Sequence, residues 1–163
     1  MAVLAGRSIA DLSLRLIGLA CMVLSGFLLA GWRFHRGVPE ALAAFGLLAL
    51  FGFAMIWVGT LIGLYASSPT MADNATFSWL FPMTFLAGTF VPIEGLPGWL
   101  RPIADWNPMT ATAAAVGHLF GNPSPVSTRA AWSLRHPIAV SLGSSLLMIA
   151  TFVPLAVRRY ART

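Results

Sequence analysis

Hydrophobic residues along this chain form long runs separated by short groups of polar residues. The runs over residues 12–32, 41–66, 75–93 and 138–157 hold almost no charged side chains. Each run is close to or above the length of about 20 residues that a helix needs to cross a hydrocarbon core of about 30 Å. The pattern therefore predicts an all-α, multi-pass membrane protein with four transmembrane helices, in which residues 1–163 form a single membrane domain.

Proline and serine residues mark several of the predicted helix ends. Pro39 begins the second run, and Glu40 lies in its first turn, where the helix dipole favours an anion. Ser67-Ser68-Pro69 ends that run, and Pro137 begins the fourth. Pro82 falls inside the third run and predicts a kink, because its ring removes one backbone hydrogen bond. Such a kink serves either as packing or as a hinge.

The segment between the third and fourth runs, residues 94–136, is too apolar for a loop in water. Five apolar residues recur at helical spacing and predict a short amphipathic helix with Pro97 at its start: Leu96, Trp99, Leu100, Ile103 and Trp106. Its two tryptophans suit the lipid–water interface. Asn107 as N-cap and Pro108 as the first helical residue predict a second helix that ends at Phe120, before Gly121. Two interpretations of this hairpin, residues 96–120, remain open. It is either a re-entrant hairpin that lines an internal surface or a pair of interfacial helices that rest on the lipid.

Composition supports a membrane protein and narrows its chemistry. Hydrophobic residues make up 58% of the chain and charged residues only 9%, too few to cover the surface of a soluble domain. The sequence contains ten arginines and no lysine. A P-loop requires a lysine and is therefore absent from this sequence. Cys21 is the one cysteine, which excludes an internal disulfide and a cysteine-based zinc site.

Charge and motif spacing also argue against nucleic-acid binding and against catalysis. The net charge is +5, but the arginines are spread along the chain without interleaved aromatic residues. The one dense group, Arg158, Arg159 and Arg162, follows an apolar run and predicts contact with anionic lipid headgroups on the cytoplasmic side. The three histidines lack the spacing of metal ligands. We therefore expect no catalytic residue and no metal site in this chain.

One ordered stretch resembles a known family. The run FLAGTFVPIEGLPGWL, from Phe85 to Leu100, followed by Asn107-Pro108-Met109-Thr110, is similar to the signature of type-2 ABC transporter permeases, in particular the daunorubicin/doxorubicin-resistance exporter branch. Residues 6–12 also resemble the entry of that family into its third span. The resemblance covers nearly the whole chain, but it matches only the C-terminal four of the six family spans. The expectation is that the N-terminal part of the family domain is absent, as in a truncated gene, a late start or a fragment.

The resemblance implies a function and a set of partners. A family member is the membrane-spanning permease subunit of an ATP-driven exporter and forms the path for an apolar or amphipathic substrate such as a drug, a lipid or a glycan. It is not an enzyme: ATP and magnesium are bound by a separate ABC ATPase subunit, and a second permease subunit, identical or related, completes the transporter. The alternative is a non-transporting membrane remnant or an accessory interaction subunit.

The resemblance also implies a location and an orientation. The protein would lie in the bacterial plasma membrane among its lipids, with both termini and the loop 67–74 in the cytoplasm and the hairpin facing outward. Arginine positions alone do not decide this orientation, because the two sides carry equal numbers and only the C-terminal group favours cytoplasmic termini.

Three groups of residues are candidates for functional roles. Arg7, Asp11 and Arg15 lie at i, i+4 and i+8 on one helix face and, with Asp73, are either ATPase contacts or solvated positions. The outer hairpin or gate would contain five residues: Glu94, Pro97, Trp99, Asn107 and Pro108. Glu94 is either a contact for a cationic substrate or a cap of the hairpin.

The third group consists of small residues suited to close helix packing. Gly59 and Gly63 in the second run, and Ala139 and Gly143 in the fourth, have the small-x-x-x-small spacing that lets membrane helices approach closely. They mark either packing within the chain or a seam between subunits. A further hypothesis assigns an aromatic surface for cargo to six residues: Trp79, Phe81, Phe85, Phe90, Trp99 and Trp106.

Overall fold

The structure, a computed structural model, describes residues 2–29, 36–88, 93–122 and 131–161, and these residues form helices and turns without a strand. The predicted all-α fold class is confirmed. Four longer helices make up most of the described chain: α1 (Ala2–Leu29), α2 (Val38–Tyr65), α3 (Pro69–Phe85) and α7 (Pro137–Tyr160). Four shorter elements lie between α3 and α7: η1 (Ile93–Gly95), α4 (Arg101–Asp105), α5 (Pro108–Phe120) and α6 (Trp132–Arg135).

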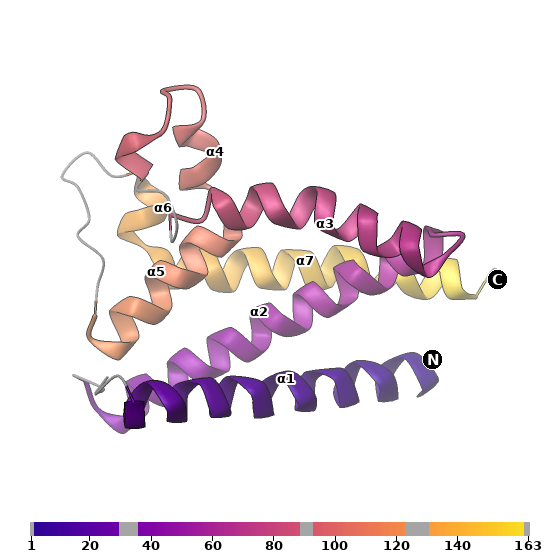
Figure 1. Ribbon diagram of the computed structural model, residues 1–163, viewed down its shortest axis with the longest axis horizontal. Coiled ribbons are helices and arrows are strands. Elements are labelled where there is room, and N and C mark those ends of the chain that lie inside the picture. The colour runs from indigo at the N-terminus through magenta and orange to yellow at the C-terminus, as the bar shows by residue number, and fades with distance from the viewer. Residues whose placement is uncertain (1, 30–35, 89–92, 123–130, 162–163) are drawn as a thin grey trace.

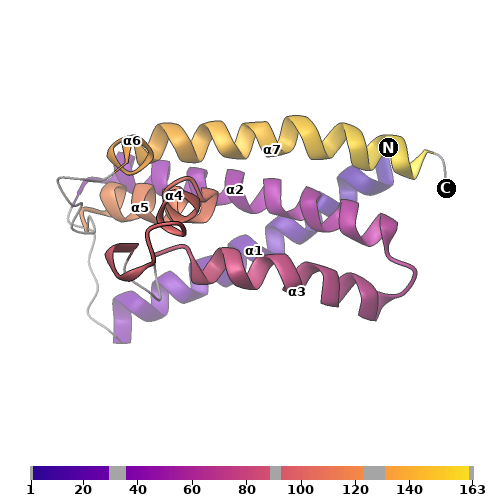
Figure 2. The same ribbon diagram turned by 90° about the horizontal axis from the view of Figure 1, so that it is seen from above.

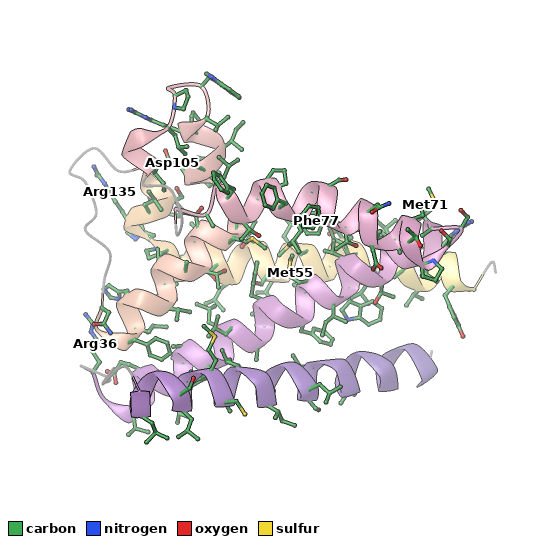
Figure 3. All side chains as sticks on the ribbon, in the orientation of Figure 1. Arg36, Met55, Met71, Phe77, Asp105 and Arg135 are labelled. Atoms are coloured by element: carbon green, nitrogen blue, oxygen red, sulfur yellow. The ribbon has the colours of Figure 1, made fainter. Side chains whose placement is uncertain are left out.

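The elements are arranged so that the two ends of the bundle differ. The start of α1, the end of α7 and the turn between α2 and α3 lie at one end, while α4, α5 and α6 gather at the other (Figure 1; Figure 2). Asp105 and Arg135 therefore lie far from Met71 (Figure 3). We call the end with both termini the terminal end and the opposite one the hairpin end.

Two helices among the described residues are long and apolar enough to cross a membrane. These are α2, with a mean hydropathy of 2.3 in its most apolar stretch, and α7, with 2.0. In α1 the apolar part is the shorter stretch Leu12–Gly26. The 17 residues of α3 extend over about 25 Å. The first and third predicted spans therefore stay predictions.

Both ends of α3 differ from the predicted span 75–93. The helix begins at Pro69, because the side chain of Ser68 accepts a hydrogen bond from the Met71 backbone N–H at 3.2 Å and the proline occupies the first turn. Most of the expected cytoplasmic loop 67–74 is therefore helical, and Asp73 lies on the helix, while the location of this segment outside the membrane stays a prediction. Serine followed by proline was the sequence signal for this start. At its other end α3 stops at Phe85, because Gly88 turns the chain away with φ +73°.

The core of the bundle lies where α2, α5 and α7 pack against one another. Small residues make this contact, and seven of them have no exposed surface: Ala44, Ala54, Ala111, Ala115, Ser141, Ser145 and Ala156. Towards the hairpin end, the ring of Phe120 meets that of Phe45 edge to face, with centroids 5.7 Å apart. We call the contact formed by these seven residues the small-residue seam.

The predicted packing motifs do not form this seam. A Cβ atom added to Gly59, Gly63 or Gly143 would meet nothing within 4 Å, and Ala139 is exposed. Gly59 directly follows the buried Val58, so it lies about 100° around α2 from the packed face. These four residues are therefore not part of the buried contact among the described residues, and their role in helix packing, within the chain or between subunits, stays a prediction.

Candidate functional site

Asn107 connects the start of α5 to the end of α3. Its Oδ1 accepts a hydrogen bond from the Met109 backbone N–H at 3.0 Å, which confirms the predicted helix start with Asn107 as N-cap and Pro108 in the first turn. Its Nδ2 donates to the Met83 carbonyl oxygen at 2.7 Å. The residue is only 3% exposed. One amide side chain thus satisfies backbone groups at two helix ends.

Two further contacts join the same helix ends. The hydroxyl of Thr110, also 3% exposed, donates to the Leu86 carbonyl oxygen at 3.3 Å. The hydroxyl of Thr84 lies 3.6 Å from the sulfur of Met109. We call this group the α3–α5 joint: Met83, Thr84, Leu86, Asn107, Met109 and Thr110. The sequence analysis assigned Asn107 to the helix start and to the outer hairpin or gate, but it did not predict the contact with Met83. It also gave no role to Thr110, although both residues lie in the Asn-Pro-Met-Thr motif.

The predicted amphipathic helix over residues 96–106 is shorter in the structure. Regular helix covers only Arg101–Asp105, with Pro102 in its first turn. The preceding residues form a turn in which the Leu100 N–H bonds to the Pro97 carbonyl at 2.9 Å. Leu96 is buried, whereas Trp99 is 73% exposed. The hairpin therefore turns only part of its apolar stripe inward.

Exposed aromatic rings cover part of the hairpin end. The rings of Trp106 and Trp132 are stacked, with centroids 6.4 Å apart and an interplanar angle of 22°. The centroid of the Trp132 ring lies 4.9 Å from that of His136, the residue directly before α7. Exposed tryptophan at the end of a membrane-length helix is typical of a lipid–water interface.

The charged residues of α4 form a small electrostatic unit on the hairpin. Nε of Arg101 donates to the Leu96 carbonyl oxygen at 2.9 Å. Burial raises the pKa of the Asp105 carboxyl group, and the nearby positive charge of Arg101 opposes this rise without cancelling it. Folding therefore disfavours the charged form of Asp105.

This shift predicts an acid-dependent gain in stability. Because the folded pKa of Asp105 lies above its ordinary value of 3.8, its contribution to stability is fully present below pH 3.8 and is lost as the pH rises through the folded pKa. We expect Asp105→Asn to raise the midpoint of thermal unfolding slightly at pH 7 and to flatten this part of the pH profile. Thermal unfolding of purified protein between pH 4 and pH 7 measures both effects. A variant with the parental slope would contradict the assignment.

An exposed row of phenylalanine rings follows α3. The ring centroids of Phe77 and Phe81 are 5.3 Å apart, and those of Phe81 and Phe85 are 5.9 Å apart. All three side chains are exposed, and none of the residues of α3 is buried. We call these three residues the phenylalanine row. The cargo hypothesis named Phe81 and Phe85 and missed Phe77, although the i, i+4, i+8 spacing is visible in the sequence.

The other aromatic candidates are dispersed. Trp79 is half-buried on α3, whereas Trp99 and Trp106 belong to the hairpin. Phe90 lies outside the described residues. The five of these six residues that the structure describes are therefore not gathered on one surface.

The remaining candidates lie at two different ends of the bundle. Arg7, Asp11 and Arg15 lie on α1, but their side chains are outside the described part of the chain, as is that of Glu94. Asp73 is exposed on α3.

At the terminal end, the guanidinium of Arg159 lies 4.8 Å from the centre of the Tyr65 ring and so connects α7 to α2. Among the described residues, no three potential metal-binding side chains gather.

Comparison with known proteins decides the family. Residues 1–120 match the sequence profile of a family described as ABC-2 type transporter, which is more than half of the chain. The chain belongs to the ABC-2 type transporter family. The match confirms the resemblance noted in the sequence. Proteins of this family are embedded in membranes.

Curated relatives of this ABC-2 chain carry drug-resistance names. It is 33% identical over 159 residues to the daunorubicin resistance ABC transporter permease protein DrrB1 of Streptomyces coeruleorubidus, covering 98% of this chain and 53% of that protein. It is 26% identical over 133 residues to the probable doxorubicin resistance ABC transporter permease protein DrrC of Mycobacterium tuberculosis, covering 80% and 48%. The chain thus spans about half the length of the curated relatives it matches. No solved structure matches the chain.

Proposed function

We propose that this chain is the membrane-spanning part of a permease subunit of an ATP-driven ABC exporter. The observation that carries the proposal is the family match, together with similarity over nearly the whole chain to a permease named for daunorubicin resistance. Its proposed partner is an ABC ATPase subunit, which would supply the P-loop that residues 1–163, without a lysine, do not contain. It binds no cofactor itself and performs no covalent chemistry.

The proposed location is the bacterial plasma membrane, with the terminal end in the cytoplasm. Arg158 and Arg159 are exposed in the last turn of α7 at this end, as expected for residues that face anionic headgroups. Asp73, on α3 at the same end, and the charged positions of α1 are the proposed contacts for the ATPase. The hairpin then lies at the outer surface, where Trp99 and the stacked Trp106 and Trp132 meet the lipid interface.

The path for the cargo is proposed to run along the phenylalanine row. Its neighbouring, exposed rings offer an apolar surface for a drug, a lipid or a glycan, and α3 buries none of its residues against the rest of the described chain. A second permease subunit is proposed to close this path. The interface between the two subunits would contain the exposed small residues Gly63, Ala139 and Gly143.

Transport of a fluorescent drug tests the proposal. The chain is co-expressed with a candidate ABC ATPase subunit, and inside-out membrane vesicles are assayed for ATP-dependent uptake of doxorubicin and for ATPase activity. We expect uptake that requires both proteins, together with a higher ATPase rate when the chain is present. Vesicles with neither effect would favour the alternative of a non-transporting remnant or accessory subunit.

A set of substitutions tests the path. Alanine at Phe77, Phe81 and Phe85 is expected to lower doxorubicin uptake severalfold, because the stacked surface is lost. The matched control places alanine at three exposed apolar positions of α1: Leu14, Ile17 and Leu28. Equal loss in both sets would remove the assignment of the path to α3.

A further inference from the structure

The end of α3 depends on hydrogen-bond donors that come from α5. The N–H groups of Leu86 and Ala87 bond to the carbonyls of Pro82 and Thr84, at 3.0 Å and 3.2 Å, as the helix tightens and ends. The carbonyl of Met83 receives the amide of Asn107 instead, and the carbonyl of Leu86 receives the hydroxyl of Thr110. These partners are 24 residues apart in sequence. The end of α3 is thus completed by the first turn of α5.

Such bonds matter more where water is excluded. A buried carbonyl group that lacks a hydrogen-bond donor destabilises the folded state, because it has lost its water partners without a replacement. Asn107 and Thr110 are almost fully buried, so water does not readily replace them. The α3–α5 joint is therefore a defined attachment rather than a loose contact.

The two helices that meet at the joint are fixed to very different degrees. On one side, α5 is held in the small-residue seam, where the hydroxyls of Thr112 and Ser141 are 2.8 Å apart and link it to α7. On the other side, α3 buries none of its residues. Its described attachments are its packing along α2, which it follows after a short turn, and the joint at its far end. The phenylalanine row lies between the turn and the joint.

We propose that Asn107 and Thr110 are positioning residues that hold the hairpin-end terminus of α3 on α5, so that displacement of its terminal end moves the phenylalanine row. This inference rests on the proposed function, because the displacement would come from the ATPase. Both residues act through α3 and do not touch the cargo, since they are buried. The joint converts a movement near Asp73 into a rotation of the exposed rings about a fixed point.

Two pairs of variants separate the joint from simple folding. Thr110→Val keeps the shape of the side chain and removes the donor to Leu86, while Thr110→Ser keeps a hydroxyl. Asn107→Asp retains the acceptor for the Met109 N–H and loses the amide donor to Met83, while Asn107→Ala loses both. Each variant is made in the complete transporter with its ATPase, and its level in the membrane is measured.

The decisive quantity is the amount of doxorubicin transported per ATP hydrolysed. We expect Thr110→Val and Asn107→Asp to lower this ratio by about fivefold, the order expected for one lost hydrogen bond. We expect Thr110→Ser to restore it, and the KM for doxorubicin to stay at the parental value. If Thr110→Val does not accumulate in the membrane, the same ratio measured for Asn107→Asp decides.

Two results would overturn the inference. One is a parental ratio in both donor-deleting variants when they are present at normal levels. The other is a changed KM with an unchanged ratio, which would place these side chains in contact with the cargo. A parent protein that transports no doxorubicin and does not stimulate the ATPase is a different failure, because it refutes the proposed function and, with it, the coupling role.

Discussion

Ala115→Leu is expected to destabilise the folded protein by about 1–3 kcal/mol or to prevent it from folding, because a larger side chain in a filled core forces its neighbours apart. Ala115 has no exposed surface and lies on α5, which packs against both α2 and α7. Its neighbours in the small-residue seam are alanines and serines without exposed surface, so α2 and α7 would have to move. Denaturant unfolding of the purified protein in detergent measures the loss.

The matched control is Ala139→Leu, which adds the same side-chain volume on the exposed face of α7. We expect this variant to unfold at the parental denaturant concentration. Equal destabilisation by both substitutions would contradict the location of the seam. Destabilisation by Ala139→Leu alone would instead place the close packing at the predicted motif of Ala139 and Gly143.

The location of this close packing could be predicted only in part from the sequence. The spacing of Gly59 and Gly63 indicated that small residues pack closely, but α2 carries small residues on several faces. Which face is buried depends on where α5 and α7 lie, and periodicity within α2 contains no such information. The seam therefore had to be found in the structure.

Local chemistry, in contrast, was readable from the sequence. The start of α5 follows from Asn107 and Pro108, because an asparagine N-cap and a proline in the first turn act on their own helix. The second bond of Asn107, to Met83, joins residues 24 positions apart and has no local signature. A motif whose residues satisfy the local rules can thus carry an additional, long-range role that only the fold reveals.

Thr112 and Ser141 are expected to show a measurable coupling energy in a double-mutant cycle. Their hydroxyl oxygens lie 2.8 Å apart between α5 and α7, and Thr112 also lies 2.8 Å from the Pro108 carbonyl oxygen. If Thr112 donates to Pro108, Ser141 is the donor within the pair. Thr112→Val then leaves the Ser141 hydroxyl buried without its acceptor, which lowers the free energy of unfolding by about 1–3 kcal/mol.

Ser141→Ala removes the other partner, and the double variant removes both. Because the double variant leaves neither hydroxyl unpaired, we expect it to lose less stability than the two single variants together. We expect this difference, which is the coupling energy, to be about 0.6–1.7 kcal/mol, the range found for hydrogen bonds between membrane helices. Unfolding free energies of the four proteins in the same detergent give this value.

The control for the cycle is Thr151→Val, which removes an exposed hydroxyl that bonds only within α7, to the carbonyls of Leu147 and Met148. We expect it to change the unfolding free energy by less than about 0.5 kcal/mol. Losses at Thr112 and Ser141 that add to within about 0.3 kcal/mol would show that the two hydroxyls act independently. In that case the small-residue seam would be held by close packing alone, and α5 would be attached to α7 without a specific bond.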